Sequence, residues 1–148
     1  MERYLLTGAT GFVGTRLLNY LSNINCTCRI LARAEVQGYD CHICDFEKNE
    51  IPSSALDSID IVFHLAGIAH DIKKNDKHES IYYSVNVNST INLAKKAAKA
   101  GVKKFIFVSS TKAGGRISTN LQMDENHQNK SDEIYGITKR EAEIKILE

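Results

Sequence analysis

The pattern of apolar and polar residues along this chain predicts five strands separated by helices and loops. Apolar runs of strand length, each ended by a turn residue or a polar stretch, lie at residues 4–6, 26–32, 42–44, 59–65 and 102–109. The fourth run is apolar nearly throughout, and so is the expected core of the fifth, Phe105-Ile106-Phe107-Val108. Continuous apolar runs of this kind are expected for parallel strands covered on both faces.

Helical periodicity predicts three helices. The first passes through Leu17, Leu18 and Leu21, and the second covers residues 77–100 and ends at Gly101. The third begins at a cap, Ser131 or Asp132, and runs to the last residue. Residues 47–58 are expected to form a short helix or turn, and residues 114–131 a loop. In the second helix the inner side is Val85, Val87, Ile91, Leu93, Ala94, Ala97 and Ala98, and the solvated side is Lys95, Lys96 and Lys99.

Strands that alternate with helices predict an α/β fold with a doubly wound parallel sheet. Right-handed crossovers and a glycine turn after the first strand favour the strand order 3-2-1-4-5. The 148 residues fit one domain, without an internal repeat or linker.

Three glycines follow the first predicted strand directly, at the spacing Gly8-x-x-Gly11-x-x-Gly14, and lead into the first predicted helix. We expect Gly8 to take the positive φ of a tight turn, Gly11 to let backbone approach a pyrophosphate, and Gly14 to let helix pack on strand. The pyrophosphate would meet free N–H groups at the positive end of the helix dipole. With a strand before it and a helix after it, the motif predicts dinucleotide binding rather than a purely structural turn.

Composition points to a small-molecule partner. The chain is 43% hydrophobic and 25% charged, and its formal net charge of +1 gives no reason to expect binding to nucleic acid or to an anionic membrane. Four cysteines, Cys26, Cys28, Cys41 and Cys44, with His42 between the second pair, have the spacing of a metal site. We favour small apolar thiols in strand cores and expect no metal, because both pairs fall on predicted strands. Without a signal peptide or a membrane-spanning run, the expected location is the cytoplasm.

A phenol and an ammonium lie one turn apart on the last predicted helix, at Tyr135 and Lys139. A phenol titrates near 10, and an adjacent cation favours its charged form, so Tyr135 can act as an acid or a base. Such a pair also arises by chance on helix surfaces. Two segments at the carboxyl ends of neighbouring predicted strands favour the catalytic interpretation, because ligands bind at that edge of an open α/β sheet: Ser109-Ser110-Thr111 and His64-Leu65-Ala66-Gly67.

Several segments together resemble the motifs of a known protein family. They are Thr7 to Gly14, Asp45, His64 to Gly67, Val85-Asn86-Val87-Asn88-Ser89-Thr90, Phe107-Val108-Ser109-Ser110, and Tyr135 with Lys139. With these, nearly the whole chain resembles the extended short-chain dehydrogenase/reductase family of nucleotide-sugar epimerases, dehydratases and ketoreductases, with Ser89 where the family has glycine. Ser110 precedes Tyr135 by 25 positions, as in UDP-galactose 4-epimerases. The resemblance implies a Rossmann sheet that binds NAD or NADP.

The resemblance also implies roles for individual residues. Tyr135 would exchange a proton with a sugar hydroxyl or keto oxygen, Lys139 would lower its pKa and hold the nicotinamide ribose, and Ser110 would hydrogen-bond the same oxygen, with Thr111 as an alternative. Asn86 would hold the active-site helix or a water, and His70 either faces an N-acetyl-hexosamine or is a solvated loop histidine. The implied cofactor-binding residues are Gly8, Thr10, Gly11, Phe12, Val13, Arg33, Asp45, Phe46, Leu65, Ala66, Gly67, Asn86, Tyr135 and Lys139.

Two features depart from the family pattern. Arg33 stands where NAD-specific members have an acidic residue, which favours NADP, although Arg33 could also lie on the adenine or point to solvent. The chain also ends after the Tyr135 helix, whereas family members continue for about as long again with a sixth strand and a C-terminal substrate lobe. The function that the resemblance implies is that of an NAD(P)-dependent epimerase, dehydratase or ketoreductase that acts on a UDP-linked sugar in surface polysaccharide synthesis. We expect the chain to be the cofactor-binding half of this enzyme and to form a homodimer through its long helices. The alternative is an inactive NAD(P)-binding module or sensor.

Overall fold

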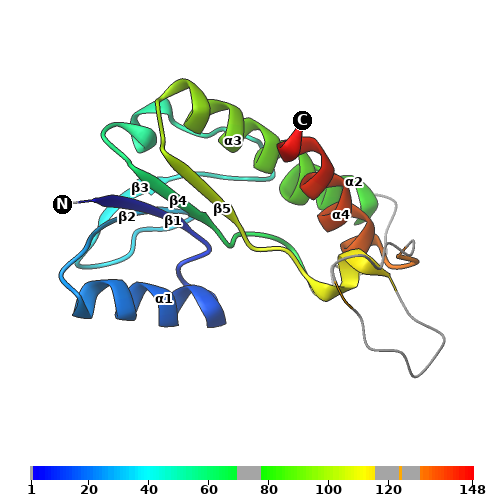
Figure 1. Ribbon diagram of the computed structural model, residues 1–148, viewed down its shortest axis with the longest axis horizontal. Helices are drawn as coiled ribbons and strands as arrows, with labels where there is room; N and C mark the ends of the chain where they lie inside the picture. The colour runs from blue at the N-terminus through cyan, green and yellow to red at the C-terminus, as the bar shows by residue number, and fades with distance from the viewer. Residues whose placement is uncertain (1, 70–77, 116–123, 125–130) are drawn as a thin grey trace.

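The computed structural model describes residues 2–69, 78–115, 124 and 131–148, and its strands form one parallel sheet (Figure 1). The order is β3-β2-β1-β4-β5, which confirms the predicted order 3-2-1-4-5. Pairing in register places Thr7 beside Leu31 on one side and His64 on the other, so the carboxyl ends of these strands share one edge. The strands are β1 (Arg3–Thr7), β2 (Thr27–Ala32), β3 (Asp40–Ile43), β4 (Ile61–His64) and β5 (Lys104–Phe107).

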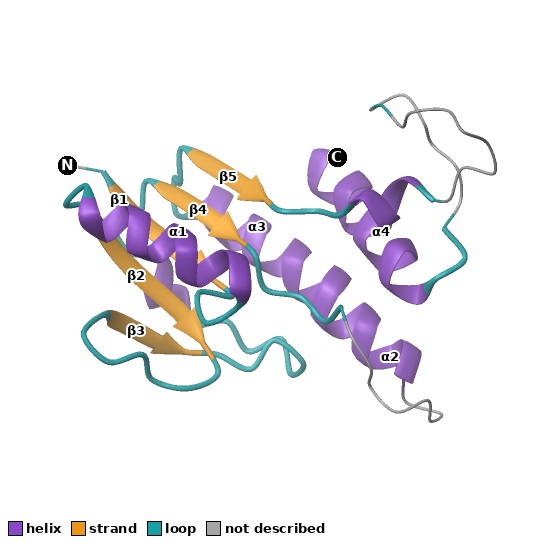
Figure 2. Cartoon of the chain, turned by 90° about the horizontal axis from the view of Figure 1, so that it is seen from below, coloured by secondary structure: helices purple, strands orange, loops and turns teal. Residues whose placement is uncertain are grey.

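Helices cover both faces of the sheet, as Figures 1 and 2 show. On one face lies α1 (Phe12–Asn23), and on the other lie α2 (His78–Tyr82), the π-helical segment η2 (Tyr83–Asn88), α3 (Ser89–Lys99) and α4 (Ile134–Leu147). Two short 3₁₀ turns, η1 (Ser53–Leu56) and η3 (Thr111–Gly114), complete the elements. Alternation along β1 sends Leu6 to the core under α1 and Leu5 to the core under α3. No helix in the described part of the chain is long and apolar enough to cross a membrane.

The predicted helix over residues 77–100 is present as one continuous helical stretch, His78–Lys99, but its middle, Tyr83–Asn88, is π-helical rather than α-helical. Val85, Asn86 and Val87 are consecutive and all buried, which one face of a regular α-helix cannot provide. The extra residue of a π turn rotates this segment so that Val85 and Asn86 both reach toward the sheet edge. Downstream, Ala97 is buried as predicted, but Ala98 is exposed rather than on the inner side.

The fifth strand is shorter and more exposed than predicted. Regular pairing covers only Lys104–Phe107, and Ile106 and Val108 keep 37% and 38% of their surface exposed. β5 is the edge strand, and α1 packs over β1 and β2 rather than over β5. The predicted buried core of this strand is therefore correct only for the side that faces α3, where Phe105 packs.

Several element ends also differ from prediction. β2 begins at Thr27, β3 spans Asp40–Ile43 rather than 42–44, and β4 is limited to Ile61–His64. The last helix begins at Ile134 after Glu133, so neither Ser131 nor Asp132 is its cap. The Ser131 hydroxyl instead accepts a 3.3 Å hydrogen bond from the Glu133 N–H, in the turn before the helix.

Candidate active site

The turn between β1 and α1 requires glycine at two of its three glycine positions. Gly8 has a φ of +68°, and a Cβ there would lie 2.7 Å from the Ala66 nitrogen. A Cβ on Gly14 would overlap the Gly8 carbonyl and lie 2.8 Å from the Ala9 Cα. The predicted positive φ of Gly8 and the close packing at Gly14 are thus confirmed. Gly11, in contrast, has extended backbone that any residue can adopt.

The same turn presents the start of α1 to the sheet edge. Gly11 is the N-cap residue, and Phe12 and Val13 begin the helix with side chains that are largely exposed. Backbone N–H groups of a first turn have no intrahelical acceptor, and this one contains no acidic residue. The helix start is therefore suited to an anion such as a pyrophosphate.

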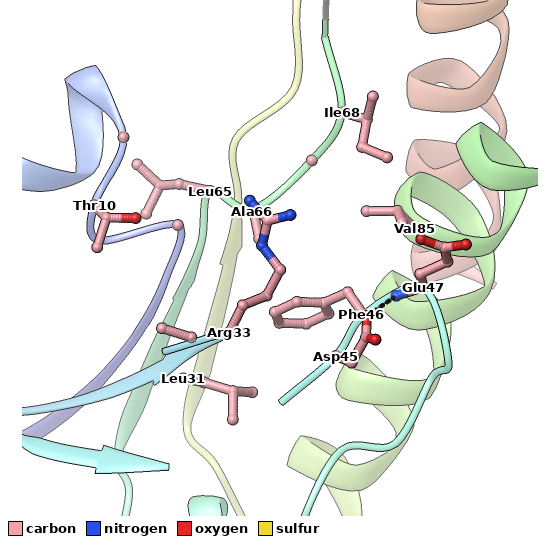
Figure 3. A pocket seen from close by; sticks show the side chains of 14 residues that line it. Thr10, Leu31, Arg33, Asp45, Phe46, Glu47, Leu65, Ala66, Ile68 and Val85 are labelled. Carbon is pink, nitrogen blue, oxygen red and sulfur yellow. Dashed lines mark hydrogen bonds between the residues drawn. The ribbon is translucent and has the colours of Figure 1, made fainter. Parts of the chain in front are cut away.

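A cavity of about 290 Å³ opens beside this turn, at the carboxyl ends of β1, β2 and β4 (Figure 3). This is the point at which the strand order reverses, where open α/β sheets bind ligands. Sequence reasoning named most of its lining residues: Gly8, Thr10, Gly11, Arg33, Asp45, Phe46, Leu65, Ala66 and Gly67. It missed Leu31, Ala32, Glu47, Ile68 and Val85.

One wall of the cavity carries charge. Arg33 follows the end of β2, and its guanidinium extends into the cavity beside the ring of Phe46 (Figure 3). Asp45 lies just beyond β3, where its Oδ1 accepts a 3.0 Å hydrogen bond from the Glu47 N–H. The cavity therefore offers a cation and carboxylates above a largely buried aromatic ring.

Asn86 lies behind the cavity wall and is 1% exposed. Its Oδ1 accepts a 2.8 Å bond from the Ile68 N–H, and its amide donates to the Ile68 carbonyl at 3.1 Å and to Thr138 Oγ1 at 3.1 Å. The side chain thus fixes the loop after β4 and joins it to α4. His70, further along this loop, lies outside the described residues.

Lys139 is held against the end of β5. Its Nζ donates a 2.6 Å hydrogen bond to the Val108 carbonyl and lies 3.9 Å from the centroid of the Phe107 ring. Burial lowers the pKa of Lys139 to about 8, against an opposing effect of Glu143. Lys139 thus remains largely protonated at pH 7, one helical turn after the partly buried Tyr135.

Ser110 lies at the same place, between β5 and η3. Its hydroxyl accepts a 3.3 Å hydrogen bond from the Lys112 N–H and caps η3, while the alternative, Thr111, is exposed on the first residue of that turn. α4 packs directly on η3, where Lys112 forms a salt bridge with Glu133. The structure thus brings the turn that carries Ser110 against the helix that carries Tyr135 and Lys139. The predicted catalytic and cofactor-binding roles of these residues remain predictions.

The cysteines belong to the cores rather than to a site. Cys26, Cys28 and Cys41 pack in the core under α1, Cys44 packs in the core under α3, and all four thiols are free. Burial raises the pKa of Cys44 to about 11. Within the described ranges, no group of three or more His, Cys, Asp and Glu side chains is arranged to hold a metal ion.

The end of β4 carries a buried histidine, His64, with no exposed surface. Three aromatic rings surround it, those of Phe46, Phe105 and Phe107. Its ring nitrogens contact the hydroxyls of Thr7 and Thr90, and the charged group nearby is Lys139. Burial, and secondarily the charge of Lys139, lowers the pKa of His64 to about 3.

This pKa shift predicts a loss of stability in weak acid. Unfolded His64 binds a proton near pH 6.5 but folded His64 does not, so its contribution is complete above pH 6.5 and declines as the pH falls toward 3. Between pH 7 and pH 5 the free energy of unfolding should fall by about 2 kcal/mol more in the wild type than in His64→Gln. Urea unfolding at the two pH values measures this difference. Equal losses in both proteins would show that folded His64 is protonated in this range.

Comparisons with known proteins agree with this geometry. Residues 4–147 match the model of the NAD dependent epimerase/dehydratase family. The chain is 35% identical over 153 residues to UDP-glucose 4-epimerase of Vibrio cholerae, covering 97% of this chain and 45% of that protein. It is 34% identical to N-acetyl-alpha-D-glucosaminyl-diphospho-ditrans,octacis-undecaprenol 4-epimerase of Escherichia coli O157:H7, covering 99% of this chain and 43% of that protein.

Solved structures show the same fold. A short-chain dehydrogenase/reductase superfamily protein from Agrobacterium tumefaciens with bound NAD superimposes with a TM-score of 0.87 at 26% identity, covering 98% of this chain and 44% of that one. MoeE5 in complex with UDP-glucose and NAD superimposes with a TM-score of 0.83 at 27% identity, covering 98% and 48%. The chain thus spans less than half the length of each of these four proteins.

Proposed function

Because the chain belongs to the NAD dependent epimerase/dehydratase family, we propose that it is the cofactor-binding part of a nicotinamide-dependent enzyme that epimerises, dehydrates or reduces a nucleotide sugar. One observation carries the proposal: the glycine turn, the cavity beside it and the Lys139 side chain held at the end of β5 all belong to one edge of the sheet. The sugar-binding part would lie outside these 148 residues, in keeping with the 45% of the Vibrio cholerae epimerase that the chain covers.

The residues present fit a nicotinamide dinucleotide. The backbone of the glycine turn, Gly8 to Gly11, and the first N–H groups of α1 would hold the pyrophosphate, since a Cβ at Gly8 would fill the space between this turn and Ala66. The wall formed by Arg33, Asp45 and Phe46 would hold the adenosine end. When bound, the nicotinamide supplies a hydride acceptor or donor.

Two side chains would act on the substrate oxygen, and a third would support them. Tyr135 would take or give the proton at its hydroxyl oxygen, and Ser110 would hydrogen-bond the same substrate oxygen. Lys139, protonated at pH 7, would favour the phenolate form of Tyr135 and hold the nicotinamide ribose.

The proposed function is tested in two steps. Calorimetry with NAD and NADP should show binding to the chain, and NMR of UDP-glucose or UDP-N-acetylglucosamine incubated with full-length protein and cofactor should show a changed sugar. Binding without conversion of these or other nucleotide sugars would favour the second candidate, an inactive module or sensor. Absence of cofactor binding would reject both.

Gly11→Val should abolish dinucleotide binding without unfolding the domain. The extended backbone of Gly11 can be adopted by any residue, and a Cβ there would lie 3.3 Å from the Gly8 carbonyl oxygen. The turn then needs to shift by only a few tenths of an ångström to accept a side chain at this position in the cavity lining, where the pyrophosphate would lie. Calorimetry measures the affinity, and Tyr20→Ala, at an exposed position further along α1, is the matched control. Unchanged affinity of Gly11→Val would reject the site.

Arg33→Ala should weaken binding of NADP more than of NAD, by about 1–3 kcal/mol, through loss of a charge-assisted hydrogen bond to the 2′-phosphate. Arg33 lines the cavity, and in the described part of the chain it forms no salt bridge that would compete. Calorimetry with both cofactors measures the difference, with Arg33→Lys as the variant that keeps the charge. Equal weakening of both cofactors would leave the arginine as a platform for adenine.

The remaining expectations belong to the same proposal. A UDP-linked sugar is supported by the Vibrio cholerae relative, a UDP-glucose 4-epimerase, whereas the name of the Escherichia coli relative specifies an undecaprenol-linked sugar instead. The role in surface polysaccharide synthesis stays a prediction. A homodimer through α3 and α4 is supported by the exposed apolar residues Ile144 and Leu147 on α4, and light scattering measures it. Four free cysteines support a cytoplasmic location.

A further inference from the structure

We propose that His64 is a positioning residue that connects the cofactor cavity to the helix carrying Tyr135 and Lys139, and that it does so as a neutral imidazole protonated on Nε2. The catalytic consequence rests on the proposed function. The hydrogen-bond arrangement itself can be tested without it.

Both nitrogens of the buried ring have a hydroxyl partner. His64 Nδ1 lies 2.7 Å from Thr7 Oγ1, at the end of β1, and Nε2 lies 2.8 Å from Thr90 Oγ1, in the first turn of α3. The ring is wholly buried, so an unmade bond at either nitrogen would have no water to replace it. His64 therefore joins β1, β4 and α3 through one side chain.

The neighbouring bonds decide which nitrogen carries the hydrogen. Thr90 Oγ1 donates its one hydrogen to the Asn86 carbonyl at 2.8 Å, so it can only accept from His64, and Nε2 must be the donor. Nδ1 is then the acceptor in a neutral ring, and the Thr7 hydroxyl donates to it. Thr7 Oγ1 in turn accepts a 3.0 Å hydrogen bond from the Ala66 N–H. Each donor hydrogen in this series of hydrogen bonds therefore has one acceptor.

The two ends of this series of hydrogen bonds are parts of the candidate site. At one end, Ala66 lines the cavity, and Thr7 directly precedes Gly8 of the glycine turn. At the other end, Asn86 holds both backbone groups of Ile68 and donates to Thr138 Oγ1, next to Lys139 on α4. The Thr90 bond fixes the backbone of the π-helical segment from which Asn86 extends. His64 thereby sets the distance between the cavity wall and α4.

The proton position is read directly by ¹⁵N NMR of the histidine rings, with His64→Gln to assign the signals. In the free wild-type protein at pH 7 we expect His64 to carry its hydrogen on Nε2 and none on Nδ1. A hydrogen on Nδ1, or on both nitrogens, would overturn the proposal whatever the protein binds. Thr90→Val removes the acceptor, so the Nε2 signal should change from that of a hydrogen-bonded N–H to that of an unbonded one, while Nδ1 still accepts from the Thr7 hydroxyl.

The functional consequence is read from kcat in the full-length protein. Thr90→Val keeps the side-chain shape but cuts the connection toward Asn86, so kcat should fall about 10-fold, while the cofactor Kd, which depends on the intact Thr7 to Ala66 side, should change by less than about 2-fold. Thr90→Ser keeps the hydroxyl and should restore most of kcat. Equal losses in the Val and Ser variants, or a loss confined to Kd, would overturn the positioning role. Failure of the wild type to bind NAD or NADP would reject the proposed function but leave the NMR result standing.

Discussion

Gly136→Ala is expected to lower kcat of the full-length protein by about 100-fold, although the same substitution in an open helix usually stabilises. A Cβ on Gly136 would overlap the Lys112 carbonyl and the Ser131 hydroxyl, and it would lie 2.8 Å from the Ser131 Cβ. The hydroxyl can rotate away, but the carbonyl belongs to the backbone of η3. α4 must then move away from η3 by roughly 1 Å, and displacements of that size cost about 100-fold in rate.

Steady-state kinetics with the nucleotide sugar that the protein accepts measures this loss, and denaturant unfolding shows whether the variant is folded. The overlap should also cost about 1–3 kcal/mol of stability. Gly101→Ala is the matched control, because Gly101 has a φ of +77°, lies in open space after α3, and should lose stability without loss of kcat. A Gly136→Ala protein with wild-type kcat would show that the approach of α4 to η3 does not set the site.

The strands and their order could be predicted because short stretches of sequence are enough to mark each strand and turn. Each apolar run between turn residues marks a strand, and the glycines at Gly8 and Gly14 mark the tight turn that opens a crossover, so the strand order follows from general chirality. The π-helical segment could not be predicted in this way. Tyr83–Asn88 contains neither glycine nor proline, and its extra residue is stabilised by tertiary contacts, such as the bonds from Asn86 to Ile68, that no local pattern encodes.

The residues that line the cavity could be predicted where they follow the ends of strands. They could not be predicted where they reach the cavity through contacts between segments that are distant in the sequence. Arg33 and Asp45 come directly after predicted strands, so the carboxyl-edge rule finds them. The same rule would have found Ala32, the last residue of β2. Val85 and Glu47 reach the cavity only because the π-helical segment packs beside the loop after β3, where Ser84 donates to the Glu47 carbonyl.

The partners of Lys139 and His64 illustrate the same limit. Sequence spacing places Lys139 one turn after Tyr135, but it does not reveal that Lys139 bonds the Val108 carbonyl or that burial brings its pKa to about 8. His64 is encoded as one residue in an apolar run. Its role depends on Thr7 and Thr90, which lie 57 and 26 positions away.

Tyr135→Phe is expected to lower kcat of the full-length protein by about 10²–10⁴-fold, the usual contribution of general acid–base catalysis. A phenol that titrates near 10 is almost wholly protonated at pH 7, so the reaction needs a cation that favours the phenolate. Lys139 is suited to this role, because with a pKa of about 8 it is mostly charged at pH 7, and its bond to Val108 keeps it in place one turn from Tyr135.

The phenyl ring keeps the packing of Tyr135, so cofactor affinity by calorimetry should be nearly unchanged while kcat falls. Lys139→Ala should damage both, because the same ammonium would hold the ribose and its loss leaves the Val108 carbonyl without its donor. Tyr20→Phe, at an exposed position on α1, should behave like the wild type and serves as the control for loss of a phenol. If Tyr135→Phe kept wild-type turnover on a nucleotide sugar that the protein converts, another group must move the proton. If the wild type converts none, the inactive binding module becomes the better account of this chain.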